Sequence, residues 1–264
     1  MSKHLVLVQP DVVWEDREAN FARVRGLLED VRPQPRSLII LPEMFAVGFT
    51  MNVEGVAEEH GGPTERFLRE LASIFDSFVV GGVVSRASSG KGLNEAVVAG
   101  PEGDVIARYA KLHPFSYAGE TVHYERGSEI VTFDWDGLLT APFICYDLRF
   151  PEIYRVAALR GAGLLVTIAN FPSARVHHWR TLLIARAIEN QAYVVGVNRS
   201  GTDPNLEYPG RSLVVDPRGD ILVEAGAGEE VLSVGISAAE VKSYREAFPV
   251  LRDIRVEIGI MGNE

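Results

Sequence analysis

The sequence contains a single cysteine, Cys145, among 264 residues. One cysteine excludes an intramolecular disulfide and a zinc site built from several cysteines. Long apolar runs are also absent. The stretch at 138–146 is about half the ~18 residues that a membrane-spanning helix needs, and the run at 5–8 is too short for the apolar core of a signal peptide. These absences predict a soluble protein of the reducing cytoplasm.

Positive charge is scarce relative to negative charge. The chain has 26 Lys and Arg residues against 36 Asp and Glu residues, a formal net charge of −10. Such a balance disfavours non-specific nucleic-acid binding and association with anionic membranes. No metal or other cofactor is expected, because the adjacent His177 and His178 point to different sides of a helix and no third ligand is near. No linker rich in Pro, Gly or Ser is present, so we expect one domain spanning residues 1–264.

Short apolar runs alternate with amphipathic segments along most of the chain. Helical spacing of apolar residues predicts helices at 16–31, 63–75, 151–160, 176–191 and 238–247. Apolar runs predict strands at 4–8, 37–41, 78–84, 94–100, 104–109, 138–145, 164–169, 192–198, 212–215, 221–224 and 231–236. The pattern predicts an α/β protein with a mixed sheet.

Three reactive side chains each follow a predicted strand. Cys145 ends an apolar strand and precedes a helix, where backbone N–H groups can stabilise a thiolate or an oxyanion. A free cysteine is also a common buried apolar residue. Glu43 and Lys111 likewise follow strands, and we expect the three to converge at one sheet edge.

The segments that hold these residues carry a family resemblance. LPEMF at 41–45, YAKLH at 109–113 and ICYDLRFPE at 144–152 occur in the order and spacing of the nitrilase superfamily of carbon–nitrogen hydrolases. FSYAGE at 115–120, ANFP at 169–172 and ARAIENQAY at 185–193 extend the resemblance over most of the chain.

The resemblance implies a four-layer α-β-β-α sandwich and a set of roles. Glu43 matches the general base, Lys111 the residue that stabilises the tetrahedral intermediate, and Cys145 the nucleophile. Glu120 matches a second glutamate that positions the substrate and supports Lys111. The family pairs subunits through outer helices, so we expect a homodimer, with the tail from about residue 248 in the dimer contacts.

The motif around the nucleophile narrows the bond class. Nitrilases that act on nitriles carry Cys-Trp-Glu, whereas this chain has Cys-Tyr-Asp, which resembles the amidase branches. The segments 43–51 and 115–120 look most like the omega-amidase branch, whose members remove the terminal amide of 2-oxoglutaramate or 2-oxosuccinamate. We expect Lys111 to favour the Cys145 thiolate and to hold the oxyanion together with the N–H of Tyr146.

Substrate contacts are expected from a set of mostly aromatic and polar residues: Phe45, Tyr117, Tyr146, Asn170, Phe171 and Arg175. Arg149, Arg175 and Arg199 are the candidates for binding a substrate carboxylate. Two alternatives stay open. One is another amidase of the superfamily, acting on deaminated glutathione, an aliphatic amide or an N-carbamoyl compound. The other is a non-catalytic scaffold with the same fold.

Overall fold

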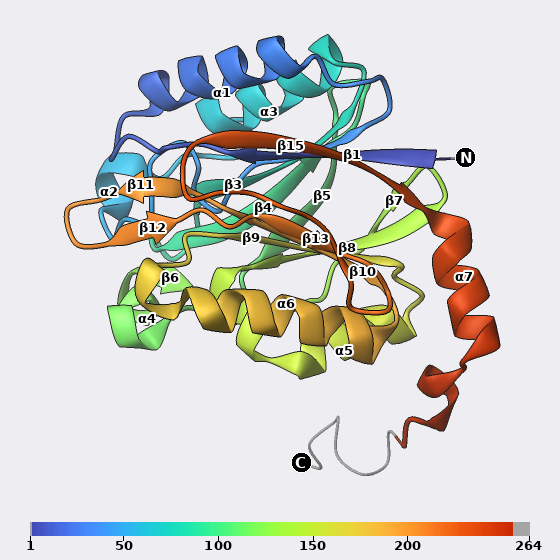
Figure 1. Cartoon of the computed structure of the whole chain (residues 1–264). Helices are drawn as coiled ribbons and strands as arrows, with labels where there is room; N and C mark the ends of the chain where they lie inside the picture. The colour runs from blue at the N-terminus through green and yellow to red at the C-terminus, as the bar shows by residue number, and fades with distance from the viewer. Residues whose placement is uncertain (1, 256–264) are drawn as a thin grey trace.

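The computed structural model describes residues 2–255, and within them two β-sheets pack face to face (Figure 1). Helices α1 (Arg17–Val31) and α3 (Pro63–Ile74) cover the outer face of one sheet. Helices α5 (Pro151–Leu159) and α6 (Val176–Asn190) cover the outer face of the other. The predicted four-layer α-β-β-α sandwich is confirmed.

The first sheet is seven-stranded, with the order β15-β1-β2-β3-β4-β5 and β6 paired to β4. Strands β1, β2 and β3 are parallel. The pairs β15–β1, β3–β4 and β4–β5 are antiparallel, and β6 pairs with β4 in parallel. The bounds are β1 Ser2–Gln9, β2 Leu38–Ile40, β3 Phe78–Arg86, β4 Gly92–Ala99, β5 Val105–Ala110, β6 Tyr124–Glu125 and β15 Glu230–Ser237.

The second sheet is six-stranded, with the order β14-β13-β10-β9-β8-β7. Its three central strands β8, β9 and β10 are parallel. The bounds are β7 Phe133–Trp135, β8 Leu138–Ile144, β9 Leu164–Ala169, β10 Tyr193–Asn198, β13 Leu213–Val215 and β14 Ile221–Glu224. Both sheets mix parallel and antiparallel pairs, as the sequence predicted.

The near-continuous apolar strands of the sequence are explained by burial on both faces. Successive side chains of a strand point to opposite faces of its sheet. In β1, Leu5 and Leu7 belong to the core between the two sheets. Val6 and Val8 instead belong to the core beneath α1 and α3. Strands buried on both faces therefore do not alternate between apolar and polar residues.

The helix ends follow the sequence signals. Asp16 precedes α1, and its side chain accepts a hydrogen bond from the Ala19 N–H at 3.0 Å. Pro63 and Pro151 occupy the first positions of α3 and α5, where the missing N–H costs nothing. Helix α5 begins at Pro151 as predicted, and Cys145–Arg149 forms a separate 3₁₀ turn, η2, between β8 and that helix.

Several short elements escaped prediction because they are too short to show a period. They are α2 (Val53–Val56), η1 (Ser116–Ala118), α4 (Glu120–His123), η3 (Ser173–Arg175), the strands β6 and β7, and the hairpin of β11 (Ser200–Thr202) with β12 (Glu207–Pro209). Among residues 2–255, no helix combines the length and apolar character needed to cross a membrane.

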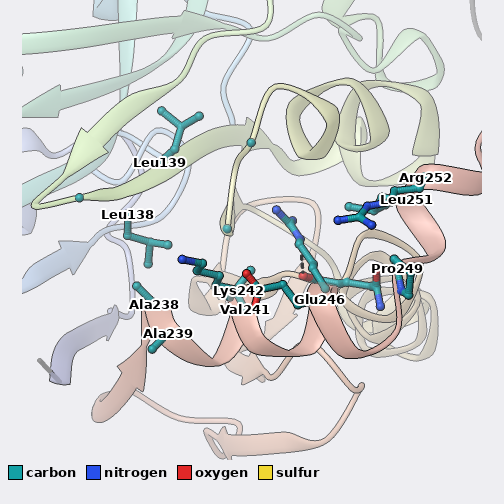
Figure 2. Close-up of a pocket in the computed structure, with 15 residues that line it drawn as sticks. Leu138, Leu139, Ala238, Ala239, Val241, Lys242, Glu246, Pro249, Leu251 and Arg252 are labelled. Atoms are coloured by element: carbon teal, nitrogen blue, oxygen red, sulfur yellow. Dashed lines mark hydrogen bonds between the residues drawn. The ribbon is translucent and has the colours of Figure 1, made fainter.

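The chain continues past β15 into α7 (Ala238–Ala247) and the 3₁₀ turn η4 (Val250–Asp253), at one end of the sandwich (Figure 1). A groove of about 630 Å³ separates these elements from the start of β8 (Figure 2). Arg245 ties α7 to the body by donating to the carbonyls of Ala162, Asn190 and Gln191. Of the tail expected in dimer contacts, residues 256–264 lie outside the described residues.

Candidate active site

The expected reactive residues meet at the ends of strands from both sheets. Glu43 follows β2 and Lys111 follows β5 in the first sheet, whereas Cys145 follows β8 in the second. The expectation that they share the edge of one sheet is corrected. Because the sheets pack face to face, the ends of their strands adjoin, and the site lies where the two sheets meet.

Lys111 lies at the centre of a buried ionic cluster. Its Nζ is 2.9 Å from Glu43 Oε1 and 2.9 Å from Glu120 Oε2. The lysine side chain is 1 % exposed and both carboxylates are 0 % exposed. Asn94 Nδ2 donates to both glutamates, at 2.7 and 2.9 Å. Two carboxylates around one ammonium leave the cluster with a net charge of −1.

The charge states in this cluster follow from its contacts. Burial raises the pKa of Glu43, but the charge of Lys111 and hydrogen bonds from Lys111, Asn94 and Asn170 outweigh it, so this pKa lies below its ordinary value of 4.5. Burial lowers the pKa of Lys111, but Glu120 and Glu43 together raise it well above its ordinary value. Glu43 is therefore ionised and Lys111 is protonated at neutral pH.

Asn170 joins Glu43 to the second sheet. It follows β9, and its backbone N–H donates to Glu43 Oε2 at 2.9 Å. Its side-chain Nδ2 donates to the backbone carbonyl of Glu43 at 2.7 Å. These two bonds fix both the carboxylate and the backbone of Glu43 relative to the strand beside Cys145.

Cys145 has a backbone conformation that few non-glycine residues adopt. Its φ is 47°, in the left-handed region, where such strain is found mostly at functional sites. Its Sγ is 3.8 Å from the carbonyl oxygen of Asn170. Burial and the charge of Glu43 raise the pKa of the thiol well above its ordinary value, although Lys111 lowers it. The expected thiolate is therefore wrong: the resting site holds a thiol.

Asp147 fixes the turn that carries Cys145. This carboxylate is fully buried and accepts hydrogen bonds from the Ile144 N–H at 3.0 Å and the Tyr109 hydroxyl at 2.8 Å. It also accepts from the His113 N–H at 3.0 Å and lies 2.9 Å from His113 Nδ1. Asp147 thus ties the cysteine turn to β5 and to the loop after Lys111. Asp147 was not predicted to have this role, although it stands within the Cys-Tyr-Asp motif.

A cavity opens beside Cys145 and Lys111. Four of the residues expected to contact substrate line it: Tyr146, Asn170, Phe171 and Arg175. Arg149, considered only as a carboxylate binder, also lines it. Further lining residues that were not predicted are Phe49, Phe115, Ala118, Pro172 and Leu206.

Three aromatic and basic residues expected at the site lie elsewhere. Phe45 is 0 % exposed and packs between the sheet and its helices, with ring centroids 6.2 Å from Phe21 and 6.0 Å from Phe67. Tyr117 is 89 % exposed and is not among the cavity-lining residues. Arg199 is buried and is not among the cavity-lining residues, and its Nε and Nη2 donate to backbone carbonyls.

Within residues 2–255, no cluster of three or more His, Cys, Asp or Glu side chains is placed to hold a metal ion. The arrangement instead places a thiol beside a carboxylate base and a protonated lysine, which suits nucleophilic attack on a carbonyl carbon. The chain belongs to the carbon–nitrogen hydrolase family, whose model matches residues 5–246.

Individual relatives match nearly the whole chain. The omega-amidase YafV of Yersinia enterocolitica is 40 % identical over 94 % of this chain and 95 % of that protein. The 2-oxoglutaramate amidase of Bacillus subtilis is 36 % identical over 95 % of this chain and 97 % of that protein. The crystal structure of XC1258 from Xanthomonas campestris, a CN-hydrolase superfamily protein, covers 97 % of this chain and 98 % of its own with a TM-score of 0.88 and 36 % identity.

Proposed function

We propose that the protein is an omega-amidase, which hydrolyses the terminal amide of 2-oxoglutaramate or 2-oxosuccinamate and releases ammonia. The observation that carries this proposal is the buried Glu43–Lys111–Glu120 cluster beside the thiol of Cys145, in a cavity with further cations. Full-length similarity to an omega-amidase and to a 2-oxoglutaramate amidase supports the substrate class.

In the proposed mechanism, Cys145 Sγ attacks the amide carbonyl carbon while its proton passes to the Glu43 carboxylate. Proton transfer accompanies attack because the resting site holds a thiol. Lys111 and the backbone N–H of Tyr146 hold the oxyanion. Glu43 then gives its proton to the leaving nitrogen, so ammonia departs and a thioester remains.

The second half of the reaction uses the same groups. Glu43, again ionised, takes a proton from water as the water oxygen attacks the thioester carbonyl. The tetrahedral intermediate collapses, the acid product leaves and the thiol is restored. Glu120 keeps Lys111 charged and in place through both halves, since it accepts two hydrogen bonds from Nζ at 2.9 and 3.1 Å.

We also propose that the enzyme works as a homodimer in the cytoplasm. Helices α5 and α6 leave apolar side chains on the outer surface, with Leu159 43 % and Ile188 52 % exposed. Pairing through this helical layer would bury both residues. A nucleophile that is the chain's single free thiol suits a reducing compartment.

The test of the proposed activity is ammonia release from a panel of amides. The panel contains 2-oxoglutaramate, glutamine, deaminated glutathione, a carbamoyl amino acid and a nitrile. We expect the highest kcat/KM with 2-oxoglutaramate, and we expect Cys145→Ala to abolish turnover without changing the thermal melting point by more than a few degrees. A preference for deaminated glutathione would refute the omega-amidase assignment. Turnover of the Cys145→Ala variant within tenfold of wild type would refute the nucleophile.

A further inference from the structure

The charged residues that line the cavity are positive, whereas the whole protein has a negative net charge. The chain has ten more acidic than basic residues. Yet the described residues lining the cavity include three basic ones, Lys111, Arg149 and Arg175, and no acidic one. An acidic protein that collects only cations around one small cavity has a local environment suited to an anion.

Lys111 adds little to the attraction of a distant carboxylate, because the two glutamates that contact its Nζ offset its charge. The two glutamates that contact its Nζ outnumber it, and the cluster carries a net charge of −1. An anionic substrate entering beside this cluster is repelled unless other cations compensate. Arg149 and Arg175 are the remaining cations on the cavity wall.

The two arginines differ in how far their donors are already used. One guanidinium nitrogen of Arg149 lies 3.3 Å from His178 Nδ1, and the group lies near the Tyr146 and Phe171 rings. Among residues 2–255, no residue forms a hydrogen bond or an ion pair with the Arg175 side chain. Its guanidinium lies over the Phe115 ring, 5.5 Å from the centroid. Arg175 therefore keeps its whole planar fork of N–H donors for a ligand.

The position of Arg175 is coupled to the catalytic cluster. The backbone N–H of Phe115 donates to Glu120, which binds Lys111. The ring beneath the guanidinium is thus part of the loop that holds the lysine. Arg175 also directly precedes α6, a fifteen-residue helix whose positive end adds to the local potential.

We propose that Arg175 is the specificity residue that binds the carboxylate of an anionic amide substrate, with Arg149 beside it. This inference rests on the proposed amidase function and narrows it. The substrate class is a short amide with a carboxylate at its far end, which an arginine fork can bind through two parallel hydrogen bonds. Neutral amides of equal length lack this contact.

The experiment compares one anionic and one neutral amide of equal chain length, glutaramate and pentanamide. Ammonia release gives kcat and KM for each with wild type, Arg175→Met, Arg175→Lys and the control Arg180→Met. Arg180 lies on the same helix and pairs with Glu224 at 3.1 Å, and it is not among the cavity-lining residues. The control thus removes an arginine of α6 without changing the cavity.

We expect Arg175→Met to raise KM for glutaramate by about 10- to 100-fold, the range expected for loss of a charge-assisted pair. Its kcat for glutaramate and both constants for pentanamide stay within about threefold of wild type. Arg175→Lys retains part of the preference for the anion, and Arg180→Met matches wild type.

The outcomes separate this inference from the function on which it rests. A wild type that prefers pentanamide contradicts the proposed omega-amidase function itself. A wild type that prefers glutaramate, together with an Arg175→Met variant that keeps this preference, overturns the role of Arg175 alone. Equal losses on both substrates in Arg175→Met likewise overturn it, because they indicate a structural role.

Discussion

The protonation of Cys145 depends on two neighbours with opposite charge. Lys111 lowers the pKa of the thiol, while burial and the carboxylate of Glu43 raise it, and the net shift is upward. The site therefore does not store a reactive thiolate. It stores a thiol next to an ionised base, so that the sulfur becomes nucleophilic only as the proton leaves. Because the thiolate is the reactive form of cysteine, such an arrangement limits reaction with electrophiles other than the bound amide.

This balance predicts that Glu43→Gln lowers the pKa of the Cys145 thiol and also lowers turnover. Removing the carboxylate leaves Lys111 as the dominant charge, so the pKa of Cys145 falls relative to wild type. Turnover nevertheless drops by about 10²–10⁴-fold, because the general base is lost. The thiol pKa can be read from thiolate absorbance against pH as the difference from Cys145→Ala, which removes the tyrosine contribution, and no second thiol interferes because Cys145 is the only cysteine. A thiol pKa in Glu43→Gln equal to or above that of wild type would show that Glu43 does not control the sulfur.

The pH dependence of kcat/KM follows from the same shifts. The pKa of Glu43 lies below 4.5, so the base is ionised above that pH and activity is lost only as pH falls through the lowered pKa. The pKa of the thiol lies above 9.0, so the reactant form persists up to that pH. We expect a plateau from about pH 5 to 9 in a profile corrected for stability. A rise or fall of kcat/KM centred near pH 7 would contradict these protonation states.

At the scale of elements, the loop after β2 is held against β3 by direct backbone contact. A Cβ built on Gly82 in β3 would lie 2.2 Å from the backbone nitrogen of Met44 and 2.6 Å from Glu43 Cα. Met44 has a φ of 44°, so the chain reverses sharply directly after the base. Only a residue without a side chain lets the strand approach this turn so closely.

We therefore expect Gly82→Ala to displace Glu43 and to lower kcat by about 10- to 100-fold, since sub-ångström placement of a base matters at this level. The matched control is Gly26→Ala in α1, where an added Cβ meets nothing within 4 Å. That change favours the helix by about 0.5–1 kcal/mol and leaves kcat unaltered. For both variants, ammonia-release kinetics measure kcat and thermal melts measure stability. Wild-type kcat in Gly82→Ala would mean that the loop position does not set the base.

At the scale of the whole molecule, the sequence predicted the layers and the residues that follow long apolar strands. The three reactive residues were identifiable because each stands at the end of such a strand, inside a specific motif. They are Glu43, Lys111 and Cys145. Asn94 escaped because it lies within a strand, where one polar residue in the sequence gives no sign of facing two buried glutamates. Packing between distant segments decides that orientation.

The errors have a similar origin. Phe45 is only two residues from Glu43 in the sequence, but the turn at Met44 directs it into the core under α1 and α3. Arg199 and Arg175 are equivalent candidates in the sequence. Only the fold reveals that Arg199 is buried away from the cavity, with its Nε and Nη2 bound to backbone carbonyls, while Arg175 lines the cavity.

The proposed reaction requires Cys145 to form a thioester with the acyl part of an anionic amide. Rapid acid quench of wild type mixed with 2-oxoglutaramate, followed by intact-mass and peptide mass spectrometry, detects this intermediate. We predict a transient adduct with the mass of the substrate minus ammonia, confined to the peptide that contains Cys145 and absent from Cys145→Ala. Ammonia release without such an adduct, accompanied by turnover in Cys145→Ala, would contradict the account.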